Sequence, residues 1–284
     1  MEKNVKVCIT GASGYMGSFL VKELLHRGYT VHATLRNLGE PSKVGLLKGL
    51  PHAETRLKFF EADIYDPDQF ALAIQGCEVV IHLATPLQHN THNSQYKNTS
   101  EAAVAGVKSI VQSCIRSGTV KRLIYTASVV AASTLNNDGS GFKDSIDETC
   151  WTPLNLSFSY SNDSLSDYVH SKTLAEKEVL SLNDKCIEVV SLACGLVGGD
   201  TLQSSMAESM GVLISQMTVR ADIASHVQKC YPEIRIPQEF IEDTKRETSW
   251  GSKKLEEMGF QYRYDFETIV EGSLHCARRM GNLL

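Results

Sequence analysis

Residues 5–36 read VKVCITGASGYMGSFLVKELLHRGYTVHATLR and contain the pattern on which the fold prediction rests. A β-branched run, Val5–Thr10, leads directly into Gly11, Gly14 and Gly17 at G-x-x-G-x-x-G spacing, and an amphipathic stretch follows. Glycine at these positions allows a tight turn and a close approach of the backbone to a pyrophosphate, whose negative charge would face the helix N-terminus. A strand, this turn and a helix in that order predict a dinucleotide-binding βαβ unit. The alternative is an ordinary strand-to-helix turn in a parallel sheet.

The first two thirds of the chain alternate β-branched runs with longer amphipathic stretches, which is typical of a parallel sheet built from βαβ units. Strands are predicted at Val5–Thr10, Tyr29–Leu35, Leu57–Glu61, Glu78–Leu83, Arg122–Ala127 and Ile187–Leu192. Helices are predicted near Tyr15–Arg27, Asp66–Gln75, Thr99–Ser117 and Ser164–Leu182. Asp66 is expected to be an N-cap with Pro67 at the first helical position. The fold class expected is α/β, with a Rossmann-type doubly wound parallel sheet.

A smaller C-terminal substrate domain is predicted to follow, so that residues 1–190 bind the cofactor and residues 191–284 contact substrate. The polar stretch Leu135–Asp167 lacks helical periodicity and is expected to be a long functional loop. Elements expected in the second domain are helices near Ser204–Met217, Thr218–Lys229, Ser252–Met258 and Asp265–Met280, and a short strand at Ile234–Pro237.

Composition narrows the function classes. The chain has 284 residues, of which 42% are hydrophobic and 21% charged, as in a globular protein. Its net charge is -5, and it has no basic run that could follow a phosphate backbone, so no nucleic-acid partner is expected. No stretch of about 18 uncharged apolar residues is present, so we expect no membrane span and a cytoplasmic location. The eight cysteines form no C-x-x-C pair, and His89 and His92 lack a third ligand, so no metal is expected.

The end of the second strand distinguishes between dinucleotides. An NAD site would place Asp or Glu there to bind the ribose 2′-hydroxyl, whereas a 2′-phosphate needs a cation. The chain has Arg36 at this point, and its first acid is Glu40. Arg36 can bind a phosphate in a fork geometry, with Lys43 as a supporting charge, which favours NADPH. Asp63 is a candidate for the adenine amino group, or else a helix cap or turn residue.

Tyr168 and Lys172 form the motif YVHSK, and their spacing places both side chains on one face of a helix. The ammonium would lower the pKa of the phenol, which makes Tyr168 a candidate general acid with Lys172 as its tuner. Ser128 ends the strand RLIYTAS at the carboxyl edge of the sheet, where it could bind a substrate carbonyl. Alone, the Tyr and Lys pair would suggest only an amphipathic surface; with the glycine turn and Ser128 it indicates a carbonyl reductase.

These motifs resemble a known family. TGASGYMGS, Arg36, HLATP (His82–Pro86), YTAS and YVHSK are similar to the plant dihydroflavonol 4-reductase group of extended short-chain dehydrogenases. DETCWTPLNLSF (Asp147–Phe158) and ACGLVGGD (Ala193–Asp200) resemble vestitone reductase-like flavonoid reductases. The resemblance implies NADPH/NADP+ as cofactor, a Ser, Tyr and Lys mechanism, and reduction of a ketone on a flavonoid or related phenolic substrate by a monomer or weak dimer.

The site residues expected from the motifs and the resemblance form two groups besides the catalytic Ser128, Tyr168 and Lys172. Cofactor contacts are expected from Gly11, Ser13, Gly14, Tyr15, Met16, Gly17, Arg36, Lys43, Asp63, Ile64, Ala84, Thr85, Tyr168, Lys172 and Leu196. Substrate contacts are expected from Pro86, Ser128, Tyr168 and Gln203, within the stretches Thr85–Gln88, Leu135–Asp167 and Leu196–Gln203.

The chain departs from the family pattern at three places. Ala127 replaces a common Ser, and Ala193 replaces a common Pro. Roughly 40 to 45 residues that relatives carry are missing near Met217. Two alternatives therefore accompany the reductase hypothesis. One is a catalytically weak or inactive NADPH-binding regulatory variant, favoured by the gap, and the other is an NAD-dependent epimerase or dehydratase, which would have an acid in place of Arg36.

Overall fold

The computed structural model describes residues 5–86, 95–156, 163–182, 187–215, 227–229 and 249–281. The chain divides into two compact units. The first consists of Met1–Phe142 and Glu148–Cys194, and the second of Lys143–Asp147 and Gly195–Leu284. The prediction did not anticipate that a short piece of the Leu135–Asp167 stretch belongs to the second unit.

The first unit is built on a six-stranded parallel sheet with the order β3-β2-β1-β4-β5-β7. Its strands are β1 (Lys6–Thr10), β2 (Thr30–Leu35), β3 (Leu57–Glu61), β4 (Val79–His82), β5 (Arg122–Ser128) and β7 (Glu188–Cys194). From β1 the chain proceeds outward to β3, returns to β4 beside β1, and then proceeds outward in the other direction. Such a reversal is the switch point beside which doubly wound sheets bind their ligands.

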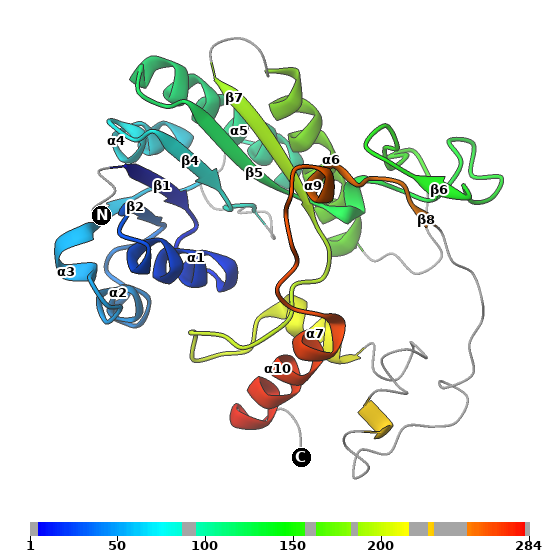
Figure 1. Ribbon diagram of the computed structural model, residues 1–284. Helices are drawn as coiled ribbons and strands as arrows, with labels where there is room; N and C mark the ends of the chain where they lie inside the picture. The colour runs from blue at the N-terminus through cyan, green and yellow to red at the C-terminus, as the bar shows by residue number, and fades with distance from the viewer. Residues whose placement is uncertain are drawn as a thin grey trace. The chain divides into compact units, whose positions relative to one another are not determined.

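Helices cover both faces of this sheet (Figure 1). The elements on the face of α1 are α1 (Tyr15–His26), α2 (Pro41–Lys48) and α3 (Ala53–Arg56), and those on the opposite face are α4 (Phe70–Ile74), α5 (Thr99–Ser117) and α6 (Asp163–Ser181). Two 3-10 turns, η1 (Pro67–Gln69) and η2 (Val129–Ala131), complete the unit. Pro67 opens η1 as predicted, but Asp66 makes no capping bond through its side chain; its carboxylate accepts from Gln69 Nε2 instead.

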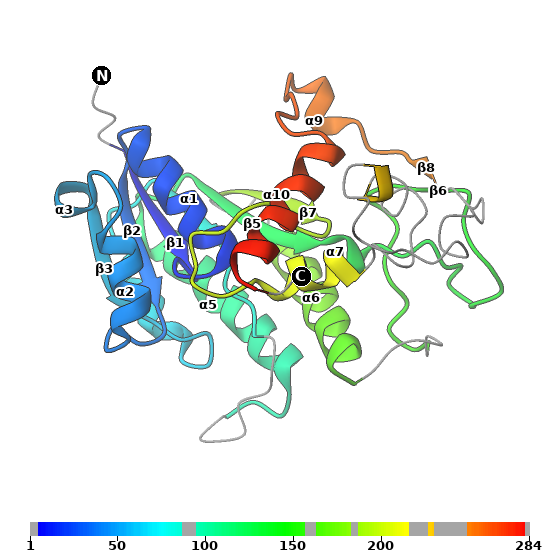
Figure 2. The same ribbon diagram turned by 90° about the horizontal axis from the view of Figure 1, so that it is seen from below.

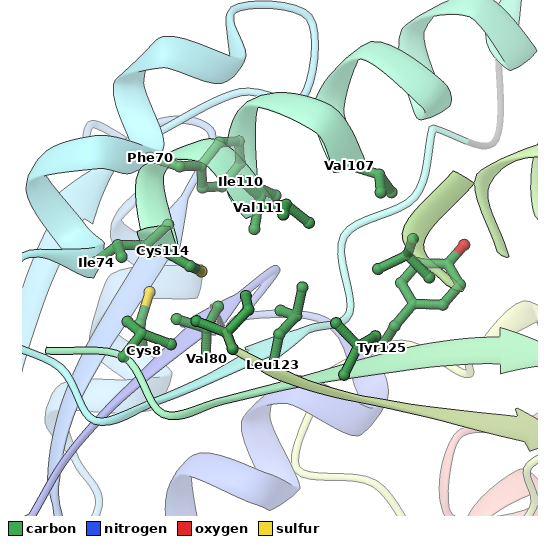
Figure 3. Close-up of a cluster of buried hydrophobic side chains, with 14 of the residues drawn as sticks. Cys8, Phe70, Ile74, Val80, Val107, Ile110, Val111, Cys114, Leu123 and Tyr125 are labelled. Atoms are coloured by element: carbon green, nitrogen blue, oxygen red, sulfur yellow. The ribbon is translucent and has the colours of Figure 1, made fainter. Parts of the chain in front are cut away.

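Two hydrophobic cores, one on each face of the sheet, explain why the strands have buried apolar side chains on both faces. In β1, Val7 and Ile9 pack toward the α1 face, whereas Cys8 lies in the opposite core. Figure 3 shows this second core, in which strand residues face the helical side chains Phe70, Ile74, Val107, Ile110, Val111 and Cys114. A side chain buried to this degree contributes about 1.5–3 kcal/mol relative to an exposed one, so both faces stabilise the sheet.

The predicted doubly wound sheet is confirmed, and the limits of the six strands predicted for the first unit lie within two residues of those observed. The helices predicted at Tyr15–Arg27, Thr99–Ser117 and Ser164–Leu182 correspond to α1, α5 and α6. The predicted Asp66–Gln75 helix is divided into η1 and α4. The helices α2 and α3 were not predicted.

The second unit contains β6 (Ser145–Ile146), which pairs in parallel with β8 (Ser249–Trp250), and the helices α7 (Glu208–Ser215), α9 (Lys254–Glu257) and α10 (Phe266–Arg279). α7 and α10 contact each other, as both views show (Figure 1 and Figure 2). The strand predicted at Ile234–Pro237 and most of the helix predicted at Thr218–Lys229 lie outside the described residues. Within the described part of the chain, no helix is both long and apolar enough to cross a membrane.

Candidate active site

The glycine turn after β1 brings α1 close to the end of that strand. Gly11 has a φ of 67°, and a Cβ there would lie 3.3 Å from the backbone of Ala84. At Gly17 a Cβ would overlap Gly11 O and lie 2.9 Å from Ala12 Cα. Only glycine permits this packing, and the first turn of α1 carries no acidic residue. The partial positive charge of a helix N-terminus therefore lies at the carboxyl edge of the sheet, where a phosphate would be stabilised.

A buried polar network joins the ends of β1 and β4. Thr10 Oγ1 accepts from the backbone N–H groups of Leu83 and Ala84, both at 3.0 Å, and lies 2.8 Å from His82 Nδ1. Because these two N–H groups already occupy both lone pairs of the hydroxyl oxygen, Thr10 donates its proton to Nδ1, which corresponds to the Nε2–H tautomer of His82. Burial, with a smaller effect of the Lys172 charge, lowers the pKa of His82 to about 3. Thr10, bonded to a neutral His82, thus holds the Ala84 backbone against the glycine turn.

Arg36 is exposed directly after β2, and no carboxylate of the described residues forms an ion pair with it. Lys43 Nζ, in contrast, lies 2.6 Å from Glu40 Oε2. Asp63 Oδ1 accepts from the backbone N–H of Tyr65, so its side chain forms a turn in this structure. Of the two cations expected at this end of the site, Arg36 is the one whose charge is not already balanced.

The predicted catalytic residues come from β5 and α6, which contact each other. Ser128 is the last residue of β5, is 7% exposed, and accepts a long hydrogen bond of 3.4 Å from Val130 N. Tyr168 and Lys172 lie one turn apart on α6, where Tyr168 is half-buried and Lys172 is buried.

Lys172 is held at the carboxyl edge of the sheet by two hydrogen bonds. Its Nζ donates to Thr126 O on β5 and to Thr85 Oγ1 after β4, both at 2.8 Å. Nζ also lies 5.4 Å from the centre of the Tyr125 ring. Burial lowers the pKa of Lys172 to about 8, while Cys194 and then Glu176 act in the opposite direction. The structure therefore brings Lys172, predicted for cofactor and catalysis, together with the predicted cofactor residue Thr85.

Four residues that the sequence did not identify belong to this arrangement, namely Tyr125, Thr126, Glu176 and Ser191. Glu176 follows Lys172 by four residues, and this helical spacing was the one signal that could have suggested it. Thr126 acts through its backbone carbonyl, which has no sequence signature.

Several other predicted cofactor and substrate residues are buried, belong to the second unit or lie outside the described residues. The Ile64 side chain is buried, 6% exposed, against the space that Gly106 leaves, so its backbone is the part that can reach a ligand. Pro86 is buried. Leu196 and Gln203 belong to the second unit. Leu87, Gln88, His89 and His92 lie outside the described residues.

The fold and the residues at its carboxyl edge define the class of extended short-chain dehydrogenases. The model of the NAD dependent epimerase/dehydratase family matches residues 7–225, and the chain belongs to this family. Its relatives indicate an oxidoreductase of the short-chain dehydrogenase type.

The relatives agree with the resemblance inferred from the motifs. The chain is 32% identical to a dihydroflavonol 4-reductase of Gerbera hybrida, over 98% of this chain and 87% of the relative. It is 31% identical to vestitone reductase of Medicago sativa, over 99% of each. The crystal structure of vestitone reductase from alfalfa matches with a TM-score of 0.80 at 28% identity, covering 98% of this chain and 99% of that one. A yeast methylglyoxal/isovaleraldehyde reductase complexed with NADPH shares the fold at 18% identity and a TM-score of 0.76.

The alignment lengths show that this chain lacks positions that its relatives have. The alignment with the Gerbera enzyme spans 324 positions whereas this chain has 284 residues, so at least 40 positions of the relative have no counterpart here. The predicted location of the gap, Met217, lies outside the described residues.

Proposed function

We propose that this protein is an NADPH-dependent reductase that converts the ketone of a flavonoid-type or related phenolic substrate to an alcohol. The observation that carries this proposal is the position of Lys172, fixed at the carboxyl ends of β4 and β5 by Thr85 and Thr126. Tyr168 lies one helical turn before Lys172 on α6. Ser128 is the last residue of β5, the strand whose Thr126 carbonyl binds Lys172. This is the placement that a proton donor, its tuner and a carbonyl binder need.

The residues present fit a dinucleotide. The glycine turn, in which a Cβ at Gly11 or Gly17 would meet backbone atoms, sets the N-terminus of α1 at the carboxyl edge of the sheet for a pyrophosphate. Arg36 offers a guanidinium to a 2′-phosphate. Such a cofactor, when bound, would supply the hydride. An acid in place of Arg36 would favour an NAD-dependent epimerase, and the chain has none there.

Three side chains of this protein would carry out the remaining steps of the reaction. Ser128 accepts from Val130 N through a lone pair, so its hydroxyl proton can bind a substrate carbonyl oxygen. Tyr168 donates the proton that the developing alkoxide needs, because the Lys172 ammonium stabilises the phenolate that is left. Lys172 keeps one donor for a cofactor ribose, since Thr85 and Thr126 occupy two of its three protons.

The names of the relatives support a phenolic substrate. Dihydroflavonol 4-reductases and vestitone reductase align with nearly the whole chain. The gap of at least 40 positions favours a second candidate, a cofactor-binding variant with weak or no turnover. Turnover distinguishes the two candidates, because both predict NADPH binding.

The test is to offer purified protein a dihydroflavonol, a flavanone or an isoflavanone with NADPH and follow cofactor oxidation. Tyr168→Phe should lower kcat about 100-fold or more while the Kd for NADPH changes little, since only the transferable proton is removed. Tyr29→Phe, just before β2 at the amino edge of the sheet, is the matched control and should retain activity. Retention of more than a tenth of the parent kcat in Tyr168→Phe would refute the assignment. Tight NADPH binding without turnover by the parent would favour the regulatory variant.

A further inference from the structure

Glu176 is a buried acid for which the proposed mechanism has no use so far. It lies on α6 with 8% of its surface exposed, four residues after Lys172 and eight after Tyr168. The three side chains therefore follow one another along the same face of α6. Carboxylates are seldom buried to this degree without a partner, because desolvation opposes the charged form.

The carboxylate of Glu176 is fixed from the sheet. Ser191 Oγ on β7 donates to Glu176 Oε1 at 2.6 Å. Burial raises the pKa of Glu176, whereas this hydrogen bond and then the Lys172 charge favour the ionised carboxylate. Ser191 pairs in register with Tyr125 on β5, the residue whose ring lies beneath the Lys172 ammonium. Glu176 is thus held beside β5, the strand that also binds Lys172.

Lys172 itself is buried without an ion pair. Its Nζ contacts two neutral acceptors, Thr85 Oγ1 and Thr126 O, and no carboxylate of the described residues lies within 4.0 Å of it. A buried ammonium in that position depends on more distant negative charge, which acts strongly where water is excluded.

We propose that Glu176 is a positioning residue of the proposed reaction: fixed by Ser191, it supplies the buried negative charge that keeps Lys172 protonated beside Tyr168. This inference rests on the proposed function for its effect on turnover, but the charge of Lys172 can be measured without turnover.

The other groups around Lys172 do not replace this charge. His82, on β4, is neutral, and Tyr125, on β5, has a pKa raised by burial and then by Glu176 and Tyr168. Cys194, on β7, has a thiol pKa that burial raises. The ion pair of Lys108 on α5 with Glu178 on α6, at 3.6 Å, is partly exposed. Among the described residues, Glu176 is therefore the carboxylate whose removal should most favour deprotonation of Lys172.

The decisive change is Glu176→Gln, which keeps the shape and the acceptor for Ser191 but removes the charge. Lysines labelled isotopically at Cε report the titration of Lys172 by NMR, with its resonance assigned through Lys172→Arg. The titration midpoint of Lys172 should fall by about one pH unit in Glu176→Gln. The basic limb of the pH profile of kcat should shift downward by a similar amount, so that the loss of activity is largest at high pH.

Two further variants separate charge from packing. Glu178→Gln, on the same helix, should leave the Lys172 midpoint unchanged, whereas Glu176→Asp restores the charge and should return the midpoint toward that of the parent. A Glu176→Gln protein that melts at a lower temperature with an unchanged Lys172 midpoint would show that Glu176 is merely structural and overturn the inference. If Glu176→Gln shifts the Lys172 midpoint but the parent protein has no turnover, the inference stands and the proposed function is rejected.

Discussion

Arg36 is the residue on which the choice between nicotinamide dinucleotides rests. It is exposed after β2 and, among the described residues, no carboxylate forms an ion pair with it. A ribose 2′-phosphate would form charge-assisted hydrogen bonds with its guanidinium, whereas a 2′-hydroxyl would gain far less. Lys43 differs because Glu40, 2.6 Å away, already balances its charge.

NADPH should therefore bind at least tenfold more tightly than NADH, which corresponds to about 1.4 kcal/mol. Arg36→Asp should reverse the preference, because a carboxylate repels the phosphate and accepts from a ribose hydroxyl. Fluorescence titration of both cofactors measures this, and Lys43→Ala is the control expected to have the smaller effect. Equal dissociation constants for the parent would contradict this role of Arg36.

The candidate catalytic residues could be predicted from the sequence because their motif is local. Tyr168 and Lys172 are four residues apart on one helix, and Ser128 ends an apolar strand. Glu176 and Ser191 could not be paired in the same way, because their bond depends on how α6 packs against β7. Such contacts between distant segments leave no periodic trace in the sequence.

At the scale of elements, the link between β1 and β4 depends on a neutral histidine. The pKa of His82 in the folded protein is about 3, below its ordinary value of 6.5. Unfolding exposes the ring, so the unfolded chain takes up a proton below about pH 6.5 that the native protein does not. The stability contributed by His82 is therefore complete above pH 6.5 and is lost as the pH falls toward 3.

Lowering the pH from 7 to 5 should reduce the free energy of unfolding by roughly 2 kcal/mol through this residue. His82→Asn should be less stable at pH 7, because it perturbs the contact with Thr10, but its stability should depend less on pH. Urea denaturation at both pH values provides the measurement. His26→Gln, on the exposed side of α1, should keep the parent's pH dependence. A parent and a His82→Asn protein with equal pH dependence would contradict the assignment.

The elements that were predicted and those that were missed differ in burial. The strands are covered on both faces, so their apolar runs are continuous and their limits are clear. In α2 only Leu47 is buried, and α3 has four residues that follow His52 at a φ of 67°, so neither shows a marked periodicity. β6 and β8 have two residues each and pair across about a hundred positions, beyond the reach of any local pattern.

At the scale of the whole molecule, the second unit exposes apolar surface. Met258 is 81% exposed, Tyr262 69%, Tyr264 61% and Phe260 51%. These residues lie close together in the sequence. The chain has no counterpart for at least 40 positions of a relative whose alignment covers 98% of this chain. A segment of that size could bury such a surface, and the stability of a whole domain is only about 5–15 kcal/mol.

Insertion of the vestitone reductase segment at Met217 should therefore raise both the melting temperature and the turnover. The NADPH affinity should change little, because the residues proposed for the cofactor lie mainly in the first unit. A Gly/Ser linker of equal length is the control and should raise neither. If the natural segment also changes neither, the gap has no consequence for stability or activity.

The assignment of Lys143–Asp147 to the second unit means that the chain passes between the units three times, at Phe142, at Asp147 and at Cys194. No single peptide cleavage can then yield two separate, complete units. A fragment that stops at Cys194 would retain Ser145–Ile146 without β8, and a fragment that starts at Gly195 would lack β6. Excision of either unit by simple truncation leaves an unpaired strand behind, so neither unit can be produced intact by cutting the chain at one position.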